Sequence, residues 1–297
     1  MRVWLVGAGY WGEKIASTLK DLGVESTIID VRNGSTIDDI NTLDPVILAT
    51  PVSDHYSTAK VLLERGHDLY VEKPLTETKE QALDLKNSMQ GDQILMVGYI
   101  FLYHQHCNML KEAIKENVLG DIKHIHVERM NWGIYRTDSS PLLNLVPHDI
   151  SIVQYLLDNN LHRTKVTTYN LSNNPNQYDK IHIEGNCGST TIQIDSSWYS
   201  PIRRRIVTVI GTKGCAIWDT DKETLIITDH KKQSESKLDN LINYETIEYN
   251  DTTPLYNELE HFIICIKTRQ QPRTDINQAI AVARTIDQIA DVTIPSR

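Results

Sequence analysis

The sequence contains few cysteines, and their spacing does not suit a metal site. Its 297 residues include four cysteines, Cys107, Cys187, Cys215 and Cys265, with no CxxC pair among them. A zinc site or a disulfide framework is therefore not expected. Cysteines scattered in this way are typical of a protein whose thiols stay reduced, so we predict a cytoplasmic location.

Long apolar runs and an excess of positive charge are also absent. The longest apolar runs span roughly five to six residues, too few to cross a bilayer. The 30 Lys and Arg residues against 39 Asp and Glu give a net charge of −9. This charge argues against a nucleic acid or an anionic membrane as the main partner, although a local cationic pocket could bind an anionic small molecule. An apolar run begins at residue 2, so we expect no signal peptide.

The histidines do not suggest a metal site either. His104 and His106 lie two positions apart in a predicted helix and should face different sides. His124 and His126 share one face of a predicted strand, but no acid or cysteine is placed to complete a site with them. We therefore predict that the protein holds no metal.

The length and the hydrophobic pattern predict two domains. With 297 residues, of which 40% are hydrophobic and 23% charged, the chain has the composition of a globular protein. Apolar runs alternate with helical patterns up to residue 119, which predicts an α/β Rossmann domain with a doubly wound parallel sheet over residues 1–119. Beyond that point the strands alternate polar and apolar residues between turn signals. We predict an α+β domain with an open, mostly antiparallel sheet over residues 120–297.

The first thirty residues contain the strongest motif. An apolar run leads into Gly7, Gly9 and Gly12, and a helical pattern and a second apolar run follow, ending at Asp30. Strand, glycine loop, helix, strand and acid, in this order, form the signature of a dinucleotide-binding βαβ unit. Gly7 would allow the tight turn, Gly9 the approach of a pyrophosphate, and Gly12 the close packing of the helix on the sheet. The N–H groups at the start of the helix would face the phosphates.

The choice of cofactor depends on Asp30. A carboxylate at this position accepts hydrogen bonds from the ribose diol of NAD and repels the 2′-phosphate of NADP. Arg32 could in principle bind a phosphate, but Asp30 would oppose it. We therefore predict NAD in preference to NADP. Tyr10 and Trp11, which lie within the glycine loop, are assigned to packing and loop shape at the cofactor site.

Polar clusters follow three of the predicted parallel strands. The C-terminal ends of such strands are where an open α/β sheet binds its ligands. We assign these clusters to the cofactor site as well: Thr50, Pro51 and His55; Glu72 and Lys73, followed by Pro74; and Tyr99.

Lys73 is the most informative of these residues. It stands at the end of a strand, between an acid and a proline, and so should point into the ligand crevice. A cation there can hydrogen-bond a nicotinamide ribose hydroxyl and a substrate hydroxyl, and it can stabilise the alkoxide that develops as hydride leaves carbon. The alternative is a solvated lysine in a turn, and the residues alone leave both interpretations open.

Together these motifs resemble the Gfo/Idh/MocA oxidoreductases, the relatives of glucose–fructose oxidoreductase and inositol dehydrogenase. The resemblance implies a Rossmann domain followed by an open antiparallel sheet, NAD(H) or NADP(H), and hydride transfer at a sugar or cyclitol carbinol. It looks strongest for the nucleotide-sugar branch, which oxidises C3 of UDP-linked N-acetylated hexosamine or hexuronate sugars. The matching segments are residues 49–51 with His55, 72–74, 97–99, 119–122, 147–150, 197–198 with Pro201 and Arg205, 211–214 and 258–262.

The resemblance makes His148 a second catalytic candidate, with Lys73. An imidazole titrates near neutrality, so it can accept the hydroxyl proton as hydride departs. The alternative is a histidine at a helix start, bonded to backbone. Relatives carry an aspartate four residues earlier, where this chain has Asn144, which can orient the ring but contributes no charge. We therefore expect a less basic His148, and we assign Asp149 as the N-cap of a helix over residues 150–157.

Two further features leave the substrate class open. Relatives often carry arginine where this chain has Leu102. Alternation along a predicted strand sends Arg203 and Arg205 to one face and Arg204 to the other. One of these faces could meet a substrate diphosphate, or it could be a solvated face or form salt bridges between subunits. A one-sided sheet needs its other face covered or solvated, and we predict a homo-oligomer, a dimer or tetramer, through this sheet.

The sequence therefore predicts an NAD-dependent oxidoreductase acting on a secondary alcohol of a sugar, nucleotide-linked and oxidised at C3. Lys73 would be the electrostatic anchor, His148 the proton carrier and Asn144 its orienting partner. One alternative is a dinucleotide- or sugar-binding sensor of the same fold without turnover, which Asn144 favours and the intact 72–74 motif opposes. Another is an inositol-type cyclitol dehydrogenase.

Overall fold

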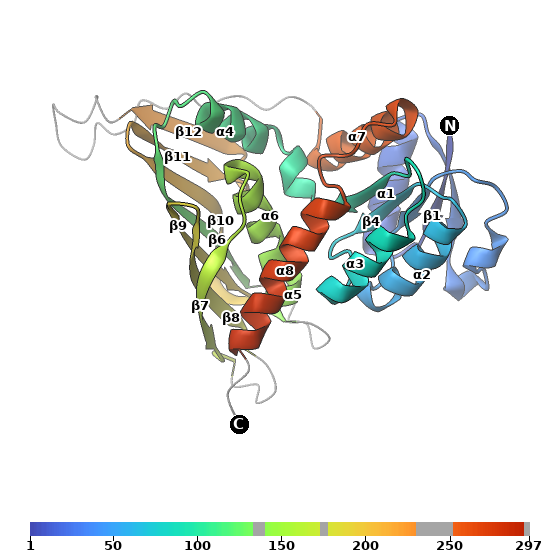
Figure 1. Cartoon of the computed structure of the whole chain (residues 1–297), viewed down its shortest axis with the longest axis horizontal. Coiled ribbons are helices and arrows are strands. Elements are labelled where there is room, and N and C mark those ends of the chain that lie inside the picture. The colour runs from blue at the N-terminus through green and yellow to red at the C-terminus, as the bar shows by residue number, and fades with distance from the viewer. Residues whose placement is uncertain (133–139, 173–177, 230–251, 294–297) are drawn as a thin grey trace. The chain divides into compact units, whose positions relative to one another are not determined.

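The computed structural model describes residues 1–132, 140–172, 178–229 and 252–293. The chain divides into two compact units, Met1–Tyr103 with Thr252–Arg284, and His104–Asp251 with Thr285–Arg297. Each unit is built on its own sheet (Figure 1). The domain ranges 1–119 and 120–297 stay a prediction. Within the described ranges, no helix combines the length and the apolar character needed to cross a membrane.

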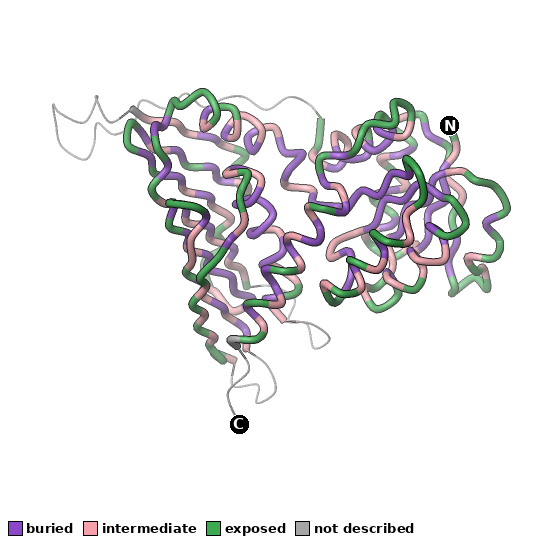
Figure 2. The backbone as a smooth tube through the Cα atoms, viewed as in Figure 1, coloured by how far each residue is buried: buried purple, intermediate pink, exposed green. Residues whose placement is uncertain are grey.

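The first unit contains a five-stranded sheet in the order β2-β1-β3-β4-β5. Every neighbouring pair is parallel, which confirms the predicted Rossmann-type sheet. Strands β1, β3, β4 and β5 are buried along almost their whole length (Figure 2), because helices cover both faces of such a sheet and the strands read as continuous apolar runs. The strands are β1 (Arg2–Val6), β2 (Glu25–Ile29), β3 (Val46–Leu48), β4 (Leu69–Glu72) and β5 (Leu95–Gly98).

Helices of the first unit follow the strands in the alternating order that the sequence predicts. They are α1 (Tyr10–Asp21), α2 (Val52–Glu64), α3 (Lys79–Ser88) and α7 (Pro254–Thr268), with short 3₁₀ turns η1 (Val31–Asn33), η2 (Ile37–Asp39) and η3 (Ile100–Tyr103). Helix α8 (Ile276–Thr293) is divided between the two units after Arg284.

The second unit contains a seven-stranded sheet in the order β12-β11-β10-β6-β9-β8-β7. Its neighbouring pairs are antiparallel except for β6 and β9, which are parallel, so the predicted mostly antiparallel sheet is confirmed. The strands are β6 (Ile122–Trp132), β7 (His162–Tyr169), β8 (Lys180–Cys187), β9 (Thr190–Ser197), β10 (Tyr199–Gly211), β11 (Gly214–Asp219) and β12 (Thr224–Asp229).

One face of this second sheet packs against the helices α4 (Gln105–Lys115), α5 (Pro141–Asn144) and α6 (Val146–Leu157) (Figure 1). Residues that point to this face, such as Ile125, Val127, Ile192 and Ile194, are almost completely buried. Most alternate residues of the same strands are half-buried or exposed, although Asp195 and Ser197 of β9 are buried (Figure 2). The period of two in the sequence therefore reports a sheet that has a core on one side.

The start of helix α6 differs from the prediction. The helix begins at Val146 after the N-cap residue Leu145, with a proline in its first turn, so Asp149 lies inside the helix and the N-cap assignment was wrong. Proline favours the first turn because its missing N–H is not needed there. The Asp149 carboxylate instead accepts hydrogen bonds from Arg129 Nε at 2.6 Å and Ser196 Oγ at 2.8 Å.

The contact between Asp149 and Arg129 is a buried ion pair. The side chain of Asp149 is 0% exposed and that of Arg129 7%. Burial raises the pKa of Asp149, and the Arg129 charge opposes this shift. Since Arg129 lies on β6 and Ser196 on β9, the pair fixes the first turn of α6, which carries His148, to the centre of the sheet.

We expect Arg129→Met to lower the free energy of unfolding by about 3–5 kcal/mol, because it leaves the buried Asp149 carboxylate without its hydrogen-bonded cation. The control is Glu128→Gln, at the neighbouring position on the same strand. It removes the ion pair between Glu128 and Arg204. Because the Arg204 side chain is 47% exposed, this loss should lower the free energy of unfolding by about 1 kcal/mol or less. Urea unfolding of both variants measures the difference. Equal losses would contradict the proposed anchoring by Asp149.

Candidate active site

The glycine loop after β1 is shaped by close backbone contacts. Gly7 has a φ of +100°, and a Cβ built on it would lie 2.6 Å from the Ala49 carbonyl oxygen. A Cβ on Gly12 would collide with the Gly7 carbonyl oxygen. A Cβ on Gly9 would meet nothing within 4 Å. Gly7 and Gly12 are therefore required by packing, while Gly9 leaves open space beside the loop.

Helix α1 begins directly after this open space. Gly9 is its N-cap residue, and no side chain in the described part of the protein caps it. The first-turn N–H groups and the helix dipole can therefore serve a phosphate. Tyr10 is 75% exposed, and the Lys14 ammonium lies 4.5 Å from the centre of its ring. Trp11 does more than fill the loop, because its Nε1–H donates to the carboxylate of Glu72.

Asp30 directly follows strand β2 and is buried. It accepts hydrogen bonds from the Ala8 N–H at 3.2 Å, the Arg32 N–H at 2.9 Å and Arg32 Nη2 at 2.5 Å. The guanidinium of Arg32, which also donates to the Ala8 carbonyl, holds the pKa of Asp30 well below its usual range. A ribose diol that binds Asp30 therefore competes with Arg32.

His55 connects the two polar clusters that follow β3 and β4. Its ring nitrogens lie 2.8 Å from the Pro74 carbonyl oxygen and 2.9 Å from the Thr50 carbonyl oxygen. Burial lowers the pKa of His55. Pro51, at the start of α2, separates Thr50 from this helix. Thr50 Oγ1 is buried, and no partner for it occurs among the residues described, so it can bond a ligand.

Lys73 lies in the turn that both clusters hold. On its N-terminal side, Glu72 accepts from Trp11 Nε1, and on its C-terminal side the Pro74 carbonyl meets His55. The backbone of Lys73 is thus fixed on both sides at the C-terminal end of β4, and its side chain is half-buried. Tyr99 follows β5, is 2% exposed, and has its pKa raised by burial.

These features fit a dinucleotide. The open space at Gly9 and the uncapped start of α1 suit a pyrophosphate, the carboxylate of Asp30 suits a ribose diol, and Thr50 Oγ1 offers a buried hydrogen-bonding group. All of them lie in the first unit, where the sequence places the cofactor site.

The second unit carries the other two predicted catalytic residues. Asn144 is the last residue of α5, and His148 lies in the first turn of α6; both are half-buried. The His148 N–H donates to the Leu145 carbonyl at 3.2 Å, and its own carbonyl accepts from Ser151 Oγ at 2.8 Å. These hydrogen bonds fix the main chain of His148 in the first turn of α6. The catalytic role of His148 stays a prediction.

The arginine triplet of β10 forms ion pairs within the second unit. Arg203 donates to Asp221 at 2.8 Å, and Arg205 Nε lies 3.7 Å from the same carboxylate. Arg204 pairs with Glu128 at 2.8 Å. The alternation predicted for these three residues is confirmed. Each guanidinium already has a carboxylate, which weakens the interpretation that they bind a substrate diphosphate.

Two expectations about the histidines were wrong: that His104 and His106 face different sides, and that no acid is placed beside His124 and His126. His104 is the N-cap residue of α4, and its ring lies 5.3 Å from that of His106. An acid does lie beside His126, because β9 pairs with β6 and places Asp195 Oδ2 3.0 Å from His126 Nε2; His182 Nδ1 is 3.0 Å from the other oxygen. Strand pairing of this kind leaves no local signal in the sequence. Over the described ranges, no set of three or more His, Cys, Asp or Glu residues could hold a metal.

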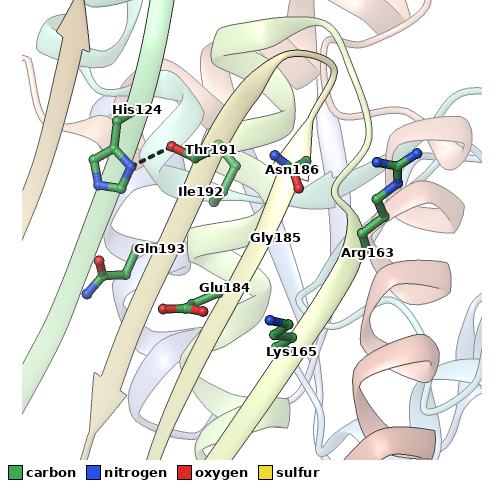
Figure 3. A pocket seen from close by; sticks show the side chains of 9 residues that line it. All are labelled: His124, Arg163, Lys165, Glu184, Gly185, Asn186, Thr191, Ile192 and Gln193. Atoms are coloured by element: carbon green, nitrogen blue, oxygen red, sulfur yellow. Dashed lines mark hydrogen bonds between the residues drawn. The ribbon is translucent and has the colours of Figure 1, made fainter.

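A cavity of about 330 Å³ lies on the second sheet, and none of the predicted site residues lines it (Figure 3). Its walls come from β6, β7, β8 and β9, and His124 Nδ1 meets Thr191 Oγ1 at 2.9 Å within it. The residues that line it are His124, Arg163, Lys165, Glu184, Gly185, Asn186, Thr191, Ile192 and Gln193.

The glycine loop provides a test that separates binding from packing. We expect Gly9→Ala to leave the free energy of unfolding almost unchanged but to weaken NAD binding about tenfold or more, since the methyl group occupies the space for the pyrophosphate. Gly12→Ala should instead lower the free energy of unfolding by about 1–3 kcal/mol through its collision with Gly7. Fluorescence titration with NAD and urea unfolding measure the two quantities. Full NAD affinity in folded Gly9→Ala would refute the assignment.

Comparison with known proteins agrees with this geometry. Residues 13–99 match the family model described as the NAD-binding Rossmann fold of the Gfo/Idh/MocA oxidoreductase family, and residues 111–291 match its C-terminal alpha/beta domain. The structure of UDP-N-acetylglucosamine 3-dehydrogenase GnnA from Acidithiobacillus ferrooxidans superposes with a TM-score of 0.85 at 18% identity, covering 98% of this chain and 97% of that one. At this identity the likeness is one of fold.

Two curated relatives are more similar in sequence. The scyllo-inositol 2-dehydrogenase (NAD(+)) of Bacillus subtilis is 26% identical over 260 residues, 80% of this chain and 72% of the relative. The 2,7-anhydro-N-acetylneuraminate hydratase of Escherichia coli is 25% identical over 180 residues, 52% of this chain and 48% of the relative. In the first two curated matches the chain spans about half the length of the relative, 49% and 48%. With both family models matched in order along its length, the chain belongs to the Gfo/Idh/MocA oxidoreductase family and contains that family's NAD-binding Rossmann fold.

Proposed function

We propose that the protein is an NAD-dependent dehydrogenase that oxidises a secondary alcohol of a sugar. The observation that carries this proposal is the position of Lys73, held at the C-terminal end of β4 between the Trp11 contact of Glu72 and the His55 contact of Pro74. A cation fixed at this edge of a Rossmann-type sheet suits an oxygen that becomes negatively charged during reaction.

The residues divide the work as follows. NAD, when bound, supplies the hydride acceptor. The backbone of the glycine loop and Asp30 hold its pyrophosphate and ribose. Lys73 donates a hydrogen bond to the substrate oxygen and stabilises its developing charge. His148 accepts the hydroxyl proton, and Asn144 orients the imidazole ring without adding charge.

For the substrate, we propose a UDP-linked N-acetylated hexose that is oxidised at C3, in a cytoplasmic setting. The fold shared with the UDP-N-acetylglucosamine 3-dehydrogenase over 98% of the chain supports this class. The cofactor is NAD in preference to NADP, because Asp30 is a carboxylate and Arg32 already donates to it. Tenfold tighter binding of NADP than of NAD in a titration would contradict this preference.

Two other functions have specific observations in their favour. Asn144, where relatives carry aspartate, favours a sensor that binds the dinucleotide without turnover. The 26% identity with the scyllo-inositol dehydrogenase of Bacillus subtilis favours a free cyclitol as substrate. Incubation of the protein and NAD with a panel of UDP-sugars and free inositols distinguishes them. Tight NAD binding without NADH formation from any compound would identify the sensor.

We further propose that the protein is a homo-oligomer through the second sheet. In the described residues no helix lies on the face opposite α4 and α6, and that face exposes large apolar side chains. Trp132 is 65% exposed, Ile210 40% and Ile217 37%. Trp132 stacks near Tyr199 with the ring centres 4.6 Å apart. Exposed apolar residues on one sheet face suit burial by a second copy of the chain.

The role of Lys73 predicts a large catalytic loss without a loss of fold. We expect Lys73→Met to lower kcat for NADH formation from a UDP-N-acetylhexose by about 10²–10³-fold, because the charge on the substrate oxygen loses its partner. The control is Lys79→Met, at the first residue of α3, which should keep full activity. Asn144→Asp should raise kcat by restoring a charge beside His148. Wild-type kcat in Lys73→Met would refute the assignment of the anchor.

The proposed interface predicts a change in association. We expect Ile217→Asp to weaken self-association by about tenfold or more, because it places a charge in an apolar contact. Val118→Asp, at a residue that is 48% exposed and precedes the sheet, serves as the control and should leave association unchanged. Analytical ultracentrifugation over a concentration series measures both variants. A wild-type protein that sediments as a single chain at all micromolar concentrations would rule out the interface.

A further inference from the structure

Helix α7 carries a glutamate on its apolar face. The buried residues of this helix include Leu255, Glu258, Leu259 and Phe262, at the spacing of a stripe that faces a core. Glu258 is 0% exposed. Glutamate is almost never fully buried unless it is paired, so its surroundings need an explanation.

Glu258 takes part in a chain of oxygen contacts that ends beside Lys73. Its Oε2 lies 3.0 Å from Tyr70 Oη, and Tyr70 Oη lies 3.0 Å from Glu72 Oε1. The phenol has a single hydrogen and can donate it to only one of the two carboxyl groups. The other oxygen–oxygen contact is of hydrogen-bond length, so a hydrogen on one of the carboxyl groups must occupy it.

The contacts of the two glutamates decide which of them holds this hydrogen. Glu72 accepts from Trp11 Nε1 and is adjacent in sequence to the cationic Lys73. Glu258 Oε1 has no hydrogen-bond partner in the described part of the chain. An ionised Glu258 would therefore be a buried charge with one bare oxygen, which is the costlier arrangement.

The directions of the pKa shifts agree with a proton on Glu258. Burial raises the pKa of Glu258 well above its usual value, and the neighbouring charge of Glu72 raises it further. Burial also raises the pKa of Glu72, but the Trp11 hydrogen bond and the Lys73 charge lower it. The other titratable groups that face Glu258 are Tyr70 and Tyr103, both phenols with raised pKa values, so neither supplies a cation.

We propose that Glu258 is a positioning residue, a neutral carboxylic acid at neutral pH that donates to Tyr70 so that Tyr70 donates to Glu72. This arrangement keeps Glu72 ionised and fixed, and thereby holds the turn that carries Lys73. The proton count depends only on the geometry, whereas the benefit to Lys73 rests on the proposed function.

Close packing leaves this chain of contacts little freedom to rearrange. A Cβ on Gly98 would lie 2.5 Å from Tyr70 Oη and 3.0 Å from Glu72 Oε1, so the cluster presses on the backbone of β5. The Tyr70 ring also meets Phe262 of α7 edge-on, with centroids 5.8 Å apart. Loss of the Glu258 proton would therefore set two carboxylates against one hydroxyl with no room to separate.

The proton can be measured without substrate or cofactor. A carboxyl group that stays protonated only in the folded state stabilises the fold fully below the ordinary glutamate pKa, and the benefit is lost as the pH rises. The pH range concerned lies between the ordinary glutamate pKa and the raised pKa of Glu258 in the folded protein. In this range the unfolding equilibrium constant of the wild type should rise about tenfold more per pH unit than that of Glu258→Gln, which cannot ionise. Urea unfolding across neutral pH measures both slopes.

A matched control and a second measurement make this test decisive. Glu77→Gln, at an exposed glutamate, should keep the wild-type slope. Carbon-13 labelling of the glutamate carboxyl groups reads the same proton by NMR in the unmodified protein, as one resonance with the shift of a protonated acid at neutral pH. Equal slopes in the wild type and Glu258→Gln, or a spectrum in which all glutamates are ionised at neutral pH, would overturn the proposal.

Activity tests the positioning role separately. Glu258→Gln can still donate to Tyr70 and should keep kcat, with the alkaline fall in rate moved to higher pH. Glu258→Ala and Tyr70→Phe break the chain of contacts and should each lower kcat about tenfold or more at unchanged KM for NAD. A Gln variant as impaired as the Ala variant would overturn the role. A protein that shows the proton but no turnover would refute the proposed function alone.

Discussion

The hydrogen bond from Trp11 to Glu72 joins the two parts of the sequence on which the first unit's site depends. Trp11 belongs to the glycine loop and Glu72 to the end of β4, sixty-one positions later in the chain. This single contact couples the loop that would hold a pyrophosphate to the turn that carries Lys73. Burial raises the pKa of Glu72, and the hydrogen bond from Trp11 opposes this shift, so the contact favours the ionised carboxylate.

Both units hold a candidate catalytic residue by a similar device. In the first, Lys73 follows Glu72, whose carboxyl group contacts Trp11 of α1 and Tyr70 of β4. In the second, His148 precedes Asp149, whose carboxylate is held by Arg129 and Ser196. In each case the carboxyl group that holds the backbone belongs to the sequence neighbour of the candidate catalytic residue. Support of this kind from a neighbouring residue can hold a site in a precise geometry.

The sequence predicts well what repeats locally and poorly what depends on distant segments. Alternating polar and apolar residues beyond residue 119 predict antiparallel strands, and β6 (Ile122–Trp132) is one of them, because this pattern lies within the strand itself. The start of helix α6 was predicted four residues too far along the chain. The helix begins with a proline in its first turn, and Asp149 does not cap it. The contact of Arg32 with Asp30, and that of Asp195 with His126, could not be predicted. They depend on side-chain rotamers and on strand register, neither of which leaves a periodic signal.

The ion pair between Asp30 and Arg32 has a consequence for how a cofactor first meets the protein. The chain carries a net charge of −9, and a dinucleotide is itself an anion, so their approach is opposed at long range. Arg32, whose side chain is 66% exposed, compensates the acid nearest to the glycine loop and presents its positive charge to solvent. Incoming phosphates would therefore meet a locally neutral entrance on a negatively charged protein, and the carboxylate of Asp30 would bind a ribose only after the ribose had displaced the guanidinium. Less repulsion in the encounter and selectivity in the final complex would then depend on two side chains that lie two residues apart.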